Sequence, residues 1–337
     1  MARRAARALR DSGASRAAVY SALAAVYVLW GSTYLGILIA ARTIPVFLVG
    51  AGRFLIAGVL LYLWSIRRGD RADHPTPGHW LVALVLGTGM LAVGNPAIAW
   101  AEPRVGSGIA ALVIATVPLF MALLDRVAYG KGVGAAAVAG LLVGFGGVAL
   151  LAGPTGAHHL DVLAVFVLLL ASLSWAAASL WSRHAPQPRR PLIGASMQMI
   201  TAGLLLTVVG AASGEMTRLP HVSGESLAAL AYLVVAGSLV GFTAYVWLLK
   251  AAPTSLVSTY AYANPVVAVF LGWAIENEPL GARTLVAGAM ILAAVALIVT
   301  ARPARPRAAA RAPAAASAQA SLAMPAEGRA GCAGSSV

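Results

Sequence analysis

Residues 94–100 read GNPAIAW, and residues 241–247 read GFTAYVW. The two stretches carry glycine, alanine and tryptophan at the same three places, so they align at an offset of 147 residues, which is 241 minus 94. The same offset pairs Pro118 with Pro265. Internal repeats show how many structural units a chain contains, and this offset predicts two copies of one unit.

The match continues toward the start of each half, where the offset is 145 residues. Trp30 then pairs with Trp175, and the dipeptide at residues 57–58 pairs with the identical dipeptide at residues 202–203. An apolar composition produces matches of alanine and leucine by chance. Repeated matches of tryptophan, proline and glycine at nearly one offset are harder to obtain, so they favour a true duplication.

The composition is that of a membrane protein. Of the 337 residues, 60% are hydrophobic and 10% are charged, whereas soluble domains carry about 25% charged residues. Ten continuous apolar spans of 19 to 24 residues can each cross a hydrocarbon core of about 30 Å as a helix, and they lack the alternation of barrel strands. The predicted spans are Ala18–Ala40, Ile44–Trp64, Trp80–Trp100, Val105–Leu124, Val133–Leu151, Val162–Trp181, Leu192–Ala212, Ser226–Leu249, Ala252–Ala274 and Ala282–Thr300.

Each copy holds five spans, and an odd number makes the second copy enter the membrane upside down. The sequence therefore predicts an all-α polytopic membrane protein with ten transmembrane helices arranged as two inverted five-helix repeats. The expected parts are a basic cytoplasmic segment (1–17), the first repeat (18–151), a linker (152–161), the second repeat (162–300) and a disordered cytoplasmic tail (301–337) that is rich in Ala, Pro and Arg.

Basic residues indicate the orientation. If both termini are cytoplasmic, 19 of the 24 Lys and Arg residues lie in cytoplasmic segments, four lie on the opposite side and Arg53 lies within a span. The positive-inside rule thus predicts a multi-pass protein of the inner or plasma membrane with both termini in the cytoplasm. The apolar run after the basic start is too long for a signal peptide and is expected to be an uncleaved first span. Basic residues scattered among loops argue against a nucleic-acid partner.

Arg53 is the only charged residue near the middle of a span. A guanidinium there costs about 2.5–3.5 kcal/mol on insertion scales, so it must face protein or water and be hydrogen-bonded. Two interpretations stay open. Arg53 bonds a polar group across a helix interface, or it anchors a carboxylate of the substrate.

Proline interrupts three spans, in Asn95-Pro96, at Pro118 and in Asn264-Pro265. Proline frees a carbonyl that a neighbouring amide can satisfy, and such breaks are either satisfied kinks or discontinuous helices that line a central cavity. All acidic residues fall in tails, loops or span ends, which predicts that no carboxylate is embedded in the membrane. Glu102, just past the third span, is expected to face a loop.

Aromatic and hydroxyl side chains gather in the first, sixth, eighth and ninth spans. A wall of rings with a few polar groups suits amphipathic small organic solutes. The candidate substrate-binding residues are Trp30, Thr33, Tyr34, Arg53, Asn95, Pro118, Trp175, Tyr245, Tyr262 and Asn264.

Five segments carry a family resemblance: residues 30–34 (WGSTY), 52–58 (GRFLIAG), 103–112 (PRVGSGIAAL), 115–120 (ATVPLF) and 260–269 (YAYANPVVAV). In this order and spacing they resemble EamA-domain proteins of the drug/metabolite transporter superfamily, and within it the YedA-like inner-membrane transporters.

The resemblance implies a two-repeat bacterial carrier that commonly exports amino acids or related metabolites, with the substrate between the repeats. It also implies that the first, third, fourth, sixth, eighth and ninth helices border the cavity. Family members often carry glutamate at the turn before the last helix of each repeat. Glu278 matches this pattern, but Lys131 stands at the corresponding place in the first half, so no role beyond structure is implied for that turn.

We therefore expect a secondary carrier that exports small metabolites, most of all amino acids or related amphipathic solutes, by alternating access. One alternative is a broad-specificity carrier for drugs or toxicants, and another is a channel or a membrane-embedded enzyme. The histidines lie in loops or at span ends and no Walker-type phosphate loop is present, so no enzyme, metal or cofactor is expected. Cys332 is the single cysteine, which excludes an intrachain disulfide. The expected partners are a small-molecule substrate and the lipid bilayer, and a homodimer stays open.

Overall fold

The computed structural model describes residues 15–68, 74–129, 135–152, 161–217, 222–252, 254–257 and 259–300. These residues form helices joined by turns and include no strand, which confirms the all-α prediction for the described part of the chain. The first fourteen residues, most of the linker, Lys131 and the tail with Cys332 lie outside the described residues.

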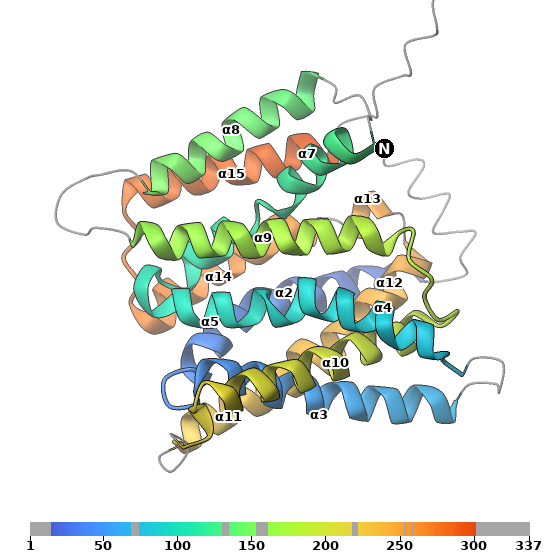
Figure 1. Ribbon diagram of the computed structural model, residues 1–337. Coiled ribbons are helices and arrows are strands. Elements are labelled where there is room, and N and C mark those ends of the chain that lie inside the picture. Colours follow the sequence, from blue (N-terminus) through green and yellow to red (C-terminus); the bar gives the residue numbers. More distant parts are fainter. Residues whose placement is uncertain are drawn as a thin grey trace, which may run out of the picture.

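The helices follow the same order in both halves of the chain (Figure 1). The first half contains α2 (Arg16–Ala40), α3 (Val46–Arg67), α4 (Pro77–Gly87), the π-helix η2 (Thr88–Ala92), α5 (Gly94–Val105), α6 (Ser107–Ile114), α7 (Val117–Tyr129) and α8 (Ala135–Ala152). The second half contains α9 (Val162–Ser182), α10 (Pro191–Ala212), α11 (Gly224–Tyr232), the π-helix η4 (Leu233–Val240), α12 (Gly241–Ala251), α13 (Thr254–Val257), α14 (Tyr260–Glu276) and α15 (Ala282–Thr300).

Among the described residues, seven helical segments are long and apolar enough to cross a membrane, and two shorter apolar helices accompany them. The seven are Arg16–Ala40, Val46–Arg67, Pro77–Val105, Ser107–Ala128, Val162–Ser182, Pro191–Ala212 and Gly224–Leu248, and the shorter two are Val138–Leu150 and Ala282–Leu297. The described part of the chain is thus all-helical, and several of its helices are long and apolar enough to cross a membrane. Ten crossings and an inverted arrangement stay predictions.

The prolines act differently from one span to the next. Pro118 is the second residue of α7, after a turn at residues 115–116 that separates it from α6, so the expected break is present there. Helix α14 instead runs unbroken through Pro265. The ninth predicted span begins as the short α13, and its long helix starts only at Tyr260.

Several local features recur at offsets of 146 or 147 residues, close to those found in the sequence. Ser15 and Asp161 cap α2 and α9 by accepting hydrogen bonds from backbone amides three residues later. Thr76 and Ser223, which are 147 residues apart, cap α4 and α11 in the same way. The π-helix at residues 88–92 corresponds at this offset to residues 235–239, which lie inside η4. Because π-helices hold well under 1% of residues in proteins, their common register supports the duplication.

Corresponding helices pack against one another. Helix α3 packs most extensively on α10, and α8 packs on α15, and Figure 1 places these two pairs at opposite edges of the molecule. Helix α2 packs on α14 and α12, and its counterpart α9 packs on α7 and α5. The first helix of each half therefore lies among helices of the other half. The largest buried apolar cluster joins α6, α9 and α15 through Leu112, Leu168 and Ile291.

Two glycines let α3 and α10 approach closely. A β-carbon on Gly58 would lie 2.9 Å from the backbone nitrogen of Ile200, and one on Gly203 would lie 2.8 Å from that of Leu55. The offset of 145 relates the two contacts residue by residue. Small residues at such places are the usual means of close helix packing in membranes.

Candidate functional site

Arg53 lies at the middle of α3 with 8% of its surface exposed. Its Nε donates a hydrogen bond to Oγ of Ser238 at 3.0 Å, and its Nη1 donates to Oδ1 of Asn95 at 3.2 Å. Ser238 belongs to η4 of the second half, and Asn95 belongs to α5 of the first half. The hydrogen bonds expected for a guanidinium at this depth are therefore present, and the bond to Ser238 connects the two halves.

Glycines in and after η4 make room for this arrangement. A β-carbon on Gly237 would lie 2.8 Å from Cγ2 of Thr33 and 3.0 Å from Nη2 of Arg53. One on Gly241 would lie 2.6 Å from Nε1 of Trp30, and that nitrogen donates a hydrogen bond to the carbonyl of Gly237 at 3.1 Å. Trp30, Thr33 and Arg53 thus meet on one short stretch of the second half.

Trp30 is also the centre of an aromatic cluster. Its ring centroid lies 5.0 Å from that of Tyr245, 5.3 Å from Tyr260 and 5.6 Å from Phe242. Tyr245 and Tyr260 are in edge contact with each other at 5.7 Å. The sequence predicted Trp30 and Tyr245. It did not assign Phe242 or Tyr260 to the site, although both lie within the stretches of rings that drew attention to it.

Trp175 occupies the corresponding place in the other half. A β-carbon on Gly94, the first residue of α5, would lie 3.8 Å from Cε3 of Trp175. The neighbouring Ser174 donates a hydrogen bond to the carbonyl of Gly89 in η2 at 2.8 Å. The contact of Trp30 with Gly241 corresponds to the contact of Trp175 with Gly94, because the offsets of the sequence repeat relate the two tryptophans and the two glycines. Each tryptophan therefore packs on the glycine that follows the π-helical turn of the opposite copy.

The other predicted residues have different roles in the structure. The hydroxyl of Thr33 donates to the carbonyl of Trp30 at 2.6 Å, so it is used within its own helix. Tyr34 and Tyr262 both pack against the large apolar cluster of α6, α9 and α15. Pro118 lies at the start of α7, beyond the turn that separates it from α6.

Some buried polar atoms in the described residues have no hydrogen-bond partner. They include Nδ2 of Asn95 and Oδ1 of Asn264, two side chains that the sequence assigned to the site. Buried polar groups are nearly always satisfied, so this unpaired donor and this unpaired acceptor are exceptions among the buried polar atoms of the described residues.

The expectation for Glu102 is wrong. Helix α5 continues past Trp100 to Val105, Glu102 is 1% exposed, and neither of its carboxylate oxygens has a hydrogen-bond partner. The prediction that no carboxylate is embedded in the apolar part of the chain fails with it. The available signal was Gly106, which ends α5 with φ of 87° and marks the helix terminus better than the first polar residue does.

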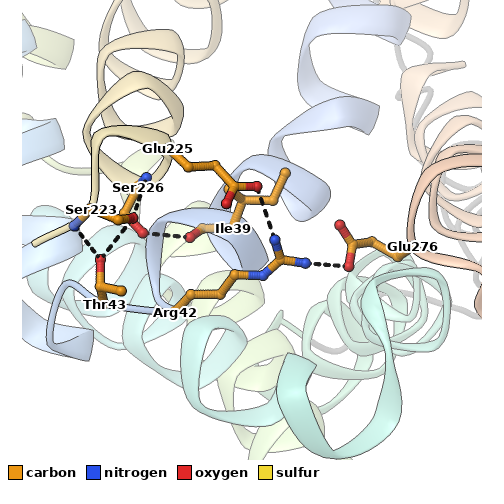
Figure 2. A network of polar contacts seen from close by, with 7 residues as sticks. All are labelled: Ile39, Arg42, Thr43, Ser223, Glu225, Ser226 and Glu276. Carbon is orange, nitrogen blue, oxygen red and sulfur yellow. Dashed lines mark hydrogen bonds and ion pairs between the residues drawn. The ribbon is translucent and has the colours of Figure 1, made fainter.

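A polar network joins the two halves at one end of the molecule (Figure 2). Arg42, just after α2, donates to Glu225 of α11 at 3.0 Å and to Glu276 of α14. Beside it, the amide of Ser223 donates to Oγ1 of Thr43 at 3.0 Å. Each of these contacts joins the first half to the second. We call the set Arg42, Thr43, Ser223, Glu225 and Glu276 the polar seal.

Two further glutamates at this end cap helices of the opposite half. Glu215 accepts hydrogen bonds from the amides of Phe47 and Leu48 at the start of α3, at 3.0 and 3.2 Å. Glu278 accepts from the amide and hydroxyl of Ser107, at 2.6 and 2.8 Å, and from the amide of Gly108 at 3.0 Å. The family resemblance pointed to Glu278, whereas no local pattern pointed to Glu215. Carboxylates at helix N-termini are favoured by the helix dipole.

Side-chain contacts sort the connecting segments into two groups. Arg104 pairs with Asp161 at 3.6 Å at the end that holds the polar seal. At the other end, Arg183 pairs with Asp125 at 3.6 Å, and Arg190 donates to the carbonyl of Ser65 at 2.8 Å. These groups agree with the alternation of the predicted spans.

Within the described ranges, no three His, Cys, Asp or Glu side chains are arranged to hold a metal ion.

Comparisons with known proteins agree on one family. The model of the EamA-like transporter family matches residues 16–153 and again residues 162–300. The uncharacterized inner membrane transporter YedA of Escherichia coli strain K12 is 35% identical over 293 residues, which cover 86% of this chain and 94% of that protein. An uncharacterized transporter of Synechocystis is 26% identical, with 82% of this chain and 88% of that protein covered. One crystal structure shares the fold with a TM-score of 0.56 at 22% identity, covering 84% of this chain and 96% of its own.

Proposed function

Because this chain belongs to the EamA-like transporter family, we propose that it is a secondary carrier that exports small metabolites by alternating access. The proposed substrates are amino acids or related amphipathic solutes. The proposed location is the inner membrane, the location named for the YedA relative, with both termini in the cytoplasm. The ten spans form two inverted five-helix repeats.

The reciprocal packing of the two halves is the observation that carries this proposal. Trp30 packs on Gly241 and Trp175 packs on Gly94, and the helices that hold these residues exchange places between the halves. Repeats related by a two-fold axis in the membrane plane make such reciprocal contacts. In carriers of this kind the substrate binds at the interface between the repeats, where the two sets of contacts meet.

The chemistry at this interface suits an amino acid. The rings of Trp30, Phe242, Tyr245 and Tyr260 supply an apolar wall. Arg53 supplies positive charge close to Asn95, whose amide donor has no protein partner. A carboxylate is recognised by a guanidinium and an amide donor, and an apolar side chain is recognised by rings.

The polar seal supports a carrier that is closed at one end. Its cation and acceptors come from different halves, so opening this end requires the ion pairs of Arg42 to break. Arg42 and Glu225 are 41% and 64% exposed, and exposed ion pairs contribute only about 0.2–1 kcal/mol each. The seal is weak enough to open during a transport cycle. By the distribution of basic residues, the sealed end faces away from the cytoplasm.

The proposal is tested by counterflow of radiolabelled amino acids in proteoliposomes that contain the full chain. We expect saturable exchange that Trp30→Ala lowers about tenfold, the effect of losing about 1.4 kcal/mol of binding. The matched control is Trp181→Ala, since Trp181 is 40% exposed on α9 and lies outside the aromatic cluster. Equal rates in the two variants would refute the site. Flux without saturation or counterflow would indicate a channel instead.

A further inference from the structure

We propose that Glu102 is the proton-binding site of this carrier and that it couples export to the proton gradient. In the conformation described here its carboxyl group holds a proton, and it exchanges this proton at the sealed end when that end opens. The proposal rests on the proposed function, because it names the coupling ion of the same transport cycle.

The burial of Glu102 is the first argument. Its side chain is 1% exposed, and neither carboxylate oxygen accepts a hydrogen bond. Among the ion pairs of the described residues, none includes Glu102. An ionised carboxylate in an apolar interior without a partner costs several kcal/mol, whereas the neutral acid avoids most of this cost. A buried glutamate with no structural bond to make is thus better explained by proton binding than by packing.

The neighbouring Glu278 is the second argument. The two carboxyl groups are close enough to interact electrostatically. Glu278 receives three hydrogen bonds, from the amide and hydroxyl of Ser107 and the amide of Gly108, at the start of α6. Two carboxylates that share a site do not both ionise readily, and donors favour the ionised form of the one that they bind. Glu278 has three donors and Glu102 has none, so Glu102 is the carboxyl group of the two that is suited to carry a proton.

The other charged or titratable groups on the helices around α5 do not supply a hydrogen-bond partner for Glu102. From α2, Tyr34 interacts electrostatically with both Glu102 and Arg53. Arg53 of α3 is bonded to Asn95 and Ser238, and Asp161 at the start of α9 is paired with Arg104. Neither α6 nor η2, which also pack on α5, contains a titratable residue.

The position of Glu102 supplies a route for the proton. It stands one helical turn before Gly106, where α5 ends and the chain turns into α6. The residues that follow this turn, Ser107 and Gly108, donate hydrogen bonds to Glu278, which lies two residues after Glu276 of the polar seal. Breaking the contacts of Glu278 and Arg42 would expose Glu102 to water on that side. A proton taken up there leaves Glu102 toward the cytoplasm in the state that is open only to that side, so it moves in the direction opposite to the exported solute and gives proton and solute antiport with no other reactant.

Infrared spectra of the purified full chain, recorded as the difference between wild type and variant, test the proton site without any solute. A protonated carboxylic acid has a C=O stretch that is separate from carboxylate bands, and we expect this band at neutral pH in the wild type. The variant Glu102→Gln is neutral and of nearly the same shape, so it should fold and lose the band. The control Glu225→Gln removes an exposed carboxylate and should keep it. Glu102→Asp keeps the acid and should shift the band, which covers the case in which Glu102→Gln does not fold.

Proteoliposomes then test the coupling. For any amino acid that the wild type exchanges, an inward proton gradient should accelerate export by the wild type and have no effect on Glu102→Gln, while counterflow persists in the variant. Absence of the acid band at neutral pH, or its persistence in Glu102→Gln, would overturn the proposal. So would full gradient stimulation of that variant. A wild type with the band and without solute exchange would instead refute the proposed function and leave the proton site intact.

Discussion

The contact between α3 and α10 gives a quantitative test of the packing. A β-carbon placed on Gly58 or on Gly203 would lie 2.9 or 2.8 Å from a backbone nitrogen of the facing helix, and real β-carbons essentially never come within 3.0 Å. Because backbone cannot rotate away, Gly58→Ala or Gly203→Ala must push the two helices apart. Overpacking of this kind costs about 1–3 kcal/mol.

The alanine also raises helix propensity by about 1 kcal/mol, which partly offsets that cost. Gly146→Ala in α8 corrects for this gain, since its β-carbon would meet only Cε of Met290, at an ordinary 3.5 Å. We therefore expect Gly58→Ala and Gly203→Ala each to be about 1–3 kcal/mol less stable than Gly146→Ala. The double variant should lose less than the sum, because helices already separated at one glycine accommodate the second.

The assay is equilibrium unfolding by sodium dodecyl sulfate in detergent micelles, followed by far-ultraviolet circular dichroism. All four variants are compared with the wild type under one set of conditions. If Gly58→Ala and Gly203→Ala were as stable as Gly146→Ala, the close approach of α3 and α10 would be wrong. Strict additivity in the double variant would show that the two glycines do not belong to one interface.

Two further variants test the polar contacts between the halves. Arg53→Ala should lower the free energy of unfolding by about 3–6 kcal/mol in the same assay, because it removes two charged hydrogen bonds and leaves Ser238 and Asn95 without them. The stability of Arg53→Lys should lie between those of the wild type and Arg53→Ala. Equal stability of the two variants would argue against the bonds. Arg42→Ala should cost no more than about 2 kcal/mol, since two partly exposed ion pairs are lost. This smaller cost should shrink in 1 M salt, where the Debye length is about 3 Å, and a cost that salt leaves unchanged would contradict the seal.

The repeated pattern predicted much of the centre of the molecule. Matching tryptophans at an offset of 145 and matching glycines at an offset of 147 indicated that Trp30 and Trp175 hold corresponding places, and each packs on one of the two matched glycines. The high cost of a charge in a span predicted that Arg53 is hydrogen-bonded, and it is. These features could be predicted because they depend on repetition or on a large energy that one residue type cannot avoid.

Other features depend on contacts that no local pattern contains. The partners of Arg42 lie 183 and 234 residues away in the chain, so its network is visible only once the halves are packed. Glu102 was misplaced because the end of a span was set at the first polar residue. A helix can carry a polar side chain beyond that point when packing covers it, and its true end follows the backbone, here at Gly106.

The π-helical turn of the first half has a geometric consequence for Arg53. A π-turn accommodates one additional residue, and each residue of an α-helix turns the chain by about 100°. The widening at residues 88–92 therefore rotates everything that follows it, so that α4 faces α10 while α5 faces α9 and α2. With a regular helix in its place, the amide of Asn95 would point roughly a quarter-turn away from the guanidinium that it now binds. The direction of the Asn95 side chain is thus set by the π-helical turn several residues earlier in the chain.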